Sequence, residues 1–161
     1  MAMNKNWPRW IFASLSKFFT DKMAIENLPM FIEGQHRDLD PTLQDYCELR
    51  IDGPNTTEVA RNQWHLYMEV NVLISSIMND SDYHRIHTSA GVVGNAFECS
   101  IPVYKYGNTV DDDDSLIGCL SLQQDRKKRE RIQISHFGQV APNTKLLQAS
   151  VEGHFIINLE V

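Results

Sequence analysis

Two long stretches of the chain alternate between apolar and polar residues with a period of two. The first runs from Trp64 to Ile74, and the second covers the C-terminal segment from Leu147 to Val161. Because successive side chains of a β-strand point to opposite faces of its sheet, each stretch predicts a strand with one buried and one solvated face. At about 3.3 Å per residue, either strand would reach about 35 Å, well beyond the usual length of about five or six residues. Long antiparallel strands of this kind are more typical of scaffolds and rings than of active sites.

A different pattern near the N-terminus, with apolar residues at spacings of three and four, predicts an amphipathic helix over residues 7–23. Asn6 precedes it in the capping position, and Pro8 stands near the first helical position, where a missing N–H is tolerated. The apolar stripe of this helix consists of Trp7, Trp10, Ile11, Leu15, Phe18, Phe19 and Met23. We expect the stripe to pack on the protein's own sheet, and an alternative is that part of it contacts a neighbouring subunit. A membrane-surface helix is disfavoured because the polar face has few basic residues.

Shorter patterns predict the remaining elements. Strands are expected at 29–33, 47–52, 63–74, 99–105, 116–122, 131–137 and 147–161, and a second helix at 83–96. Gly53 and Pro54 should end the second of these strands, which leaves residues 54–62 as a polar connection. Gly153 is expected to form a bulge in the last strand.

The second helix carries signals at its start and in its middle. Asp80, Ser81 and Asp82 precede it as capping candidates. Gly91 and Gly94 lower its intrinsic stability by about 1 kcal/mol each, which suggests that its backbone packs closely against another element.

The order of helix, three strands, helix and four strands predicts a single α+β domain over residues 1–161. We expect a mainly antiparallel β-sheet or sandwich with an N-terminal amphipathic helix and a second central helix. The predicted core residues are Leu15, Phe18, Leu49, Ile51, Leu66, Met68, Val70, Ile101, Val103, Ile134, Phe155 and Ile157. A chain of 161 residues can bury roughly two-thirds of its unfolded surface in such a core.

Composition narrows the class of protein. The net charge of −6 argues against a general polyanion binder. Of the three cysteines, Cys47 and Cys99 stand among apolar residues, so we expect reduced, buried thiols made in a cytoplasm. The chain has no signal-peptide core and no run near the ~20 apolar residues of a membrane span. These features predict a soluble protein without a membrane partner.

The sequence lacks a catalytic constellation. It has no GxSxG elbow, Cys-His signature or P-loop. His84 and His87 lie at a spacing that two zinc ligands can use, but no pattern supplies a third ligand, so we interpret them as solvated or capping residues. We therefore predict no enzyme, no metal and no cofactor.

Two charged segments need a separate explanation. Asp111, Asp112, Asp113 and Asp114 form a run of like charges that should disfavour local order. The run is expected to be a solvated loop tip; the alternatives are a negative wall beside passing DNA and a calcium site. Arg126–Arg131 is a basic cluster without interleaved aromatic residues, which favours a hairpin tip that contacts an acidic neighbouring surface over sequence-specific DNA recognition.

Taken together, the segments resemble the small neck and tail-completion proteins of tailed bacteriophages, above all tail terminators. The resemblance covers nearly the whole chain. It lies in the segments WPRWIFASLSKFF, FIEG, CELRIDGP, WHLYMEVNVLI, IPVYKYG, DDDDSLIGCL and SVEGHFIINLEV, and in their order.

The resemblance implies a virion structural protein made in the host cytoplasm that forms a ring, usually hexameric, and catalyses nothing. Such a ring caps the tail tube, contacts a head-side connector or stopper protein, and lets DNA pass through its lumen. The residues expected at subunit or partner interfaces are Trp7, Trp10, Phe12, Tyr104, Tyr106, Arg126, Lys127, Lys128 and Arg129. The residues expected to face the channel are Asp111, Asp112, Asp113 and Asp114. The main alternative is a stand-alone cytoplasmic binding or assembly-chaperone module.

Overall fold

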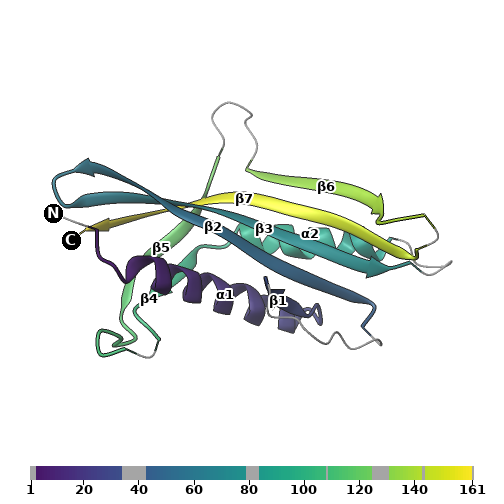
Figure 1. Ribbon diagram of the computed structural model, residues 1–161, viewed down its shortest axis with the longest axis horizontal. Helices are drawn as coiled ribbons and strands as arrows, with labels where there is room; N and C mark the ends of the chain where they lie inside the picture. Colours follow the sequence, from purple (N-terminus) through teal and green to yellow (C-terminus); the bar gives the residue numbers. More distant parts are fainter. Residues whose placement is uncertain are drawn as a thin grey trace.

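The computed structural model describes residues 3–33, 43–78, 84–107, 109–124, 131–142 and 144–160. Its elements occur in the predicted order, and the predicted α+β class is confirmed. They are α1 (Trp7–Ile25), β1 (Met30–Ile32), β2 (Asp45–Ala60), β3 (Gln63–Ile77), α2 (Arg85–Phe97), β4 (Ile101–Tyr104), β5 (Leu116–Gln123), β6 (Ile132–Gln139) and β7 (Leu146–Glu160). Figure 1 shows both helices on one side of a long, curved sheet.

The sheet is built around the two alternating stretches that the sequence marked. Its strands follow the order β1-β2-β3-β7-β5-β4, and β6 pairs with β7 outside this path. β3 and β7 pair in antiparallel register from Gln63↔Glu160 to Ile77↔Leu146. The short pairing of β1 with β2 is parallel, and the other pairings in the described sheet are antiparallel.

The core is centred on three phenylalanine rings that join α1, α2 and β7. Phe97 lies 5.2 Å from Phe19 and 5.6 Å from Phe155 between ring centroids, and all three side chains are fully buried. Most predicted core residues are buried, while Phe18 and Ile51 are only partly buried against the core. The prediction for Ile134 is wrong, because this side chain lies on a strand at the border of the sheet and is 45% exposed.

β2 does not stop at Gly53 and Pro54 as predicted. It continues to Ala60 through a cis Gly53–Pro54 peptide bond, and a register shift between Asp52 and Asn55 absorbs the irregularity. A proline is tolerated here because β2 has no strand partner on its outer side beyond this point, so no ladder hydrogen bond needs its missing N–H. The residues that were predicted as a polar connection are therefore the outer strand of a long hairpin with β3.

The glycines of β7 and α2 also differ from the predictions. β7 pairs with β3 in continuous register through Gly153, so Gly153 forms no bulge. The core leaves no room for a side chain at this position, because a Cβ there would lie 2.7 Å from Cδ2 of Phe97. Gly91 is not closely packed, since a Cβ there would meet no atom within 4 Å. For Gly94, the nearest atom to such a Cβ is Cδ1 of Ile134 at 4.0 Å.

β5 and β6 do not form the hairpin that was expected around the basic cluster. Both run antiparallel to β7, and the pair Gln123↔His154 is followed on the same border by Ile132↔Gly153. The two strands therefore lie end to end along β7. Arg126, Lys127, Lys128 and Arg129 fall outside the described residues, as do the capping candidates Asp80, Ser81 and Asp82.

The second helix and the cysteines differ from prediction in detail. α2 begins at Arg85, with His84 in the N-cap position and no side-chain capping hydrogen bond. Cys47 is buried as predicted, whereas Cys99 is only partly buried because it lies between α2 and β4 rather than inside a strand.

Candidate functional site

The acidic run belongs to a loop between β4 and β5 that is fastened to the first turns of α1. Arg9 donates two hydrogen bonds to Asp112, from Nη1 to Oδ2 at 2.8 Å and from Nη2 to Oδ1 at 2.7 Å. Trp10 donates from Nε1 to Oδ1 of the same carboxylate at 2.7 Å, and the backbone N–H of Thr109 donates to Oδ2 at 2.8 Å. The Asp112 side chain is only 4% exposed, so it acts as an anchor and not as a solvated charge.

The electrostatics of this anchor follow from its geometry. The hydrogen bond from Arg9 is the largest cause that holds the pKa of Asp112 well below its ordinary value near 3.8. Burial raises the pKa of Asp112, but the hydrogen bonds from Arg9, Trp10 and Thr109 lower it by more. The pKa of Arg9 is raised in turn, chiefly by its hydrogen bond to Asp112. The pair therefore stays ionised in its bidentate arrangement.

Asp111 and Asp113 of the run also accept hydrogen bonds within the loop and from α1's N-terminal flank. Asp111 accepts a hydrogen bond from Nδ2 of Asn6 at 3.0 Å. Asp113 accepts from the backbone N–H of Ser115 at 3.1 Å and from its Oγ at 2.6 Å, and these bonds lower the pKa of Asp113. Asp114 has a φ of 56°. Separate donors thus contact Asp111, Asp112 and Asp113, while the Asp111, Asp113 and Asp114 side chains face solvent as the predicted loop tip requires.

The aromatic residues predicted at an interface divide into two groups. Trp7 and Trp10 are 4% and 2% exposed, so the protein's own core takes up these side chains. Phe12 and Tyr104 remain on the surface at 43% and 37% exposure. This division shows that the apolar stripe of α1 serves mainly the chain's own fold, while Phe12 projects away from it.

Tyr104 and Tyr106 form a surface pair beside the clamped loop. Their ring centroids are 6.2 Å apart, and the Tyr106 hydroxyl donates to the carbonyl oxygen of Ala13 at 2.9 Å. The backbone N–H of Tyr104 donates to Oγ of Ser14 at 3.1 Å, so α1 covers the outer border of β4. The two rings line a shallow cavity of about 590 Å³ with Lys17.

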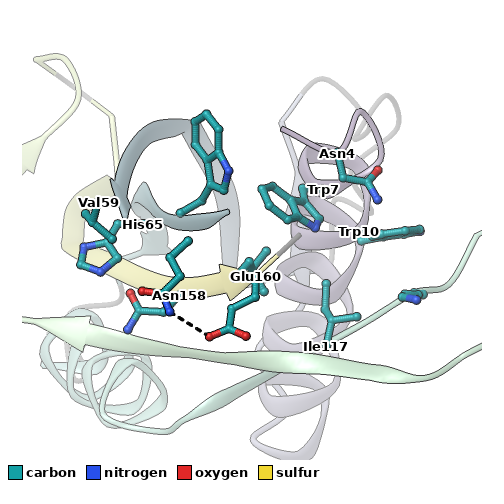
Figure 2. A pocket seen from close by; sticks show the side chains of 12 residues that line it. Asn4, Trp7, Trp10, Val59, His65, Ile117, Asn158 and Glu160 are labelled. Carbon is teal, nitrogen blue, oxygen red and sulfur yellow. Dashed lines mark hydrogen bonds between the residues drawn. The ribbon is translucent and has the colours of Figure 1, made fainter. Parts of the chain in front are cut away.

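A larger pocket of about 710 Å³ lies between the start of α1 and the β2–β3 hairpin, and the sequence did not predict it. Figure 2 shows Trp7 and Trp10 of α1 on one side of it, with Val59 and His65 of the β2–β3 hairpin and Asn158 of β7 opposite. Its lining is completed by Asn4, Gln63, Trp64, Lys105, Ile117, Leu159 and Glu160. These residues are distant in the sequence, and the tryptophans were the only visible signal.

The pocket is lined by tryptophan rings and by side chains of both charges. Lys105 Nζ lies 5.8 Å from the ring centroid of Trp10, and Glu160 accepts a hydrogen bond from Gln63 at 3.2 Å. The Trp64 Nε1 is buried and has no hydrogen-bond partner among the described residues. An apolar group with a hydrogen-bond acceptor would suit this lining.

The histidines of α2 also meet a partner that the sequence did not indicate. His87 lies 6.4 Å from His84 and 4.4 Å from His136 of β6 between ring centroids. In the described part of the chain, no group of three or more His, Cys, Asp or Glu residues is arranged to hold a metal ion. None of the described helices is long and apolar enough to cross a membrane.

Comparison with known proteins gives a fold neighbour and no family. No family model and no curated protein matches this chain. Six chains among the solved structures match it, and one of these aligns with 99% of this chain and 98% of its own length. That neighbour has 12% sequence identity and a TM-score of 0.52, and its name states no activity. At this identity the likeness concerns the fold alone, and it extends over the whole chain.

Proposed function

We propose that this chain is a virion structural protein of the phage neck or tail end, which self-associates into a ring and joins the tail tube to the head-side connector. The observation that carries the proposal is the long curved sheet with unpaired borders and exposed apolar side chains. β6 has a strand partner on one side only in the described sheet, and it exposes Ile134 and Phe137. A sheet border of this kind is a template for pairing with another chain.

The acidic loop between β4 and β5, which holds Asp111–Asp114, supports the second part of the proposal, in which DNA passes through the ring without adhering to it. Asp111, Asp113 and Asp114 present their side chains to solvent from a loop that Asp112 anchors. Exposed charges are screened beyond about 8–10 Å at physiological salt, so repulsion requires a ring of such loops around a narrow lumen. An ordered loop keeps these charges at defined positions, as this role requires.

Self-association is the property to test first. Gel filtration with light scattering and negative-stain electron microscopy of the purified chain should show a ring of uniform mass with a central opening. A mass of one chain at the highest soluble concentration contradicts the proposal.

The role of the acidic loop has its own test, in which the anchor is left intact. The double variant Asp111→Lys, Asp114→Asn should assemble normally but retain duplex DNA in a filter-binding assay, because the lumen loses its negative wall. A matched variant with the same change in charge, Asp21→Lys on α1 with Glu26→Gln at its C-cap, should retain no more DNA than the unmodified protein. Equal DNA retention by both variants would assign the effect to net charge and not to the loop.

The pocket favours one alternative, a binding or assembly-chaperone module without catalytic activity. Its volume of about 710 Å³ and its tryptophan lining suit a segment of a partner protein. Such a module would remain monomeric, and its tryptophan fluorescence would change when the partner binds. The light-scattering mass therefore discriminates between the two functions.

A further inference from the structure

Among the described residues, two long unpaired borders lie on opposite sides of the sheet and toward opposite ends of its strands. One is the outer side of β6, whose described pairing is with β7 alone. The other is the outer side of β2 from residue 53 to 60, beyond the part that β1 covers at Cys47–Leu49. The three-residue β1 is the end strand beside Cys47–Leu49, and the border along β4 is covered by α1. Figure 1 shows β6 along one long side of the sheet and β2 along the other.

The β6 border has the composition of a strand that meets another strand. Its eight residues, Ile132–Gln139, include no proline and no Lys, Arg, Asp or Glu, which are the residues that protect natural sheet borders. Ile134 is 45% exposed and Phe137 is 59% exposed. Without a covering partner, such a strand would invite aggregation.

The β2 border is comparable in length and has one exposed apolar side chain. Residues 55–60 are all exposed, and Val59 is 49% exposed. Glu58 is the single charged residue between positions 53 and 60, so no like-charge pair would arise on contact with the uncharged β6.

We propose that the β6 border of one copy pairs with the β2 border, residues 53–60, of a second copy in a head-to-tail contact. This inference rests on the proposed function, since it names the strands through which the chain self-associates. Exposed Ile134 and Phe137 of one copy then pack near Val59 of the next, which removes all three from water.

Strand direction is consistent with this contact. β2 and β7 run in the same direction because each is antiparallel to β3, and β6 is antiparallel to β7. A second copy with its strands aligned therefore presents β2 antiparallel to β6. Because β6 is level with residues 45–51 of β2 in its own copy, residues 53–60 of the second copy reach β6 only when that copy is also shifted along the strand direction. The sheet of one copy continues into the next in the pairing mode that it already uses.

The symmetry of the contact distinguishes it from a simple dimer. Because β6 and β2 are different surfaces, each bound copy offers an open border to a further copy, and the chain of contacts closes into a ring if the rotation between copies permits it. A contact between two β6 strands would instead end at two copies and leave both β2 borders open.

Two double variants test this assignment. Ile134→Lys with Phe137→Lys places charges on the β6 border, and Thr57→Lys with Val59→Lys places them on the β2 border. Each variant alone should be a single chain by light scattering, with an unchanged circular dichroism spectrum that shows that it is folded. An equimolar mixture should form a species of twice that mass, because one variant retains a native β2 border and the other a native β6 border.

The control is Ile25→Lys, at a side chain that is 75% exposed at the end of α1 and belongs to neither border, and this variant should assemble like the unmodified protein. If the β2 variant still forms a dimer while the β6 variant does not, the contact joins two β6 strands and the assignment is wrong. If the unmodified protein assembles and neither variant changes it, the borders are not used, although ring formation stands. A monomeric unmodified protein would remove support from both proposals.

Discussion

Replacing Gly153 by Ala should destabilise the protein, although the same change in most strands is favourable. Gly153 is paired with Val70 inside β7, and the Cβ of an alanine would lie 2.7 Å from Cδ2 of Phe97 and 2.9 Å from Cδ1 of Leu122. Phe97 cannot withdraw easily, because its ring is fully buried and packs against the rings of Phe19 and Phe155. The added methyl group therefore has to displace core side chains.

The expected magnitude is a balance of two effects. Replacing glycine by alanine at a compatible backbone position stabilises a protein by about 0.4–1 kcal/mol, because it lowers the conformational entropy of the unfolded chain. Overpacking of a dense core costs about 1–3 kcal/mol. We therefore expect the free energy of unfolding to fall by about 1–2 kcal/mol and Tm to fall by about 2–8 °C in a chain of this size.

Urea unfolding followed by circular dichroism measures this change, and Gly91→Ala is the matched control. Gly91 lies in the exposed middle of α2, and a Cβ at this position would contact no other part of the protein within 4 Å, so alanine should stabilise the protein by up to about 1 kcal/mol. Combining Gly153→Ala with Phe97→Leu should reduce the cost of the first change, because the clashing ring is gone. A Gly153→Ala protein at least as stable as the unmodified one would refute the reasoning.

Three further predictions concern the anchor, the core and the thiols. Asp112→Asn should lower the free energy of unfolding at neutral pH. Because the fold lowers the pKa of Asp112, this loss should persist at every pH above the ordinary aspartate pKa near 3.8 and shrink as the pH falls below 3.8. Asp111→Asn, the control, should have little effect on stability. A difference that grows in acid would contradict the assignment. Phe155→Ala should cost about 3–5 kcal/mol in denaturant unfolding, and a loss below about 1 kcal/mol would be inconsistent with its burial. A water-soluble thiol reagent should modify exposed Cys119 in the folded protein but buried Cys47, whose pKa is raised by desolvation, only after unfolding; early reaction of Cys47 would show that the core opens.

The sequence by itself determined the elements whose pattern is local. Alternation of apolar and polar residues identified β3 and β7, and a stripe at spacings of three and four identified α1, because each pattern reflects which side of one element faces the core. The α+β class followed from the order of these elements. Local patterns were also enough to place Leu66, Phe155 and most of the core.

Only the tertiary structure decided the roles that depend on partners distant in the chain. Asp112 belongs to a run of like charges, yet it is an anchor because Arg9, 103 residues away, donates to it. Ile134 has the alternation of a core residue but is exposed, because β6 lies at a border where the α-helical layer does not cover it fully. From the sequence, Gly153 is predicted to form a bulge. In the fold, its missing side chain leaves the space that the Phe97 ring occupies. A period in the sequence shows which residues share a face, whereas burial and ion pairing depend on what the fold brings against that face.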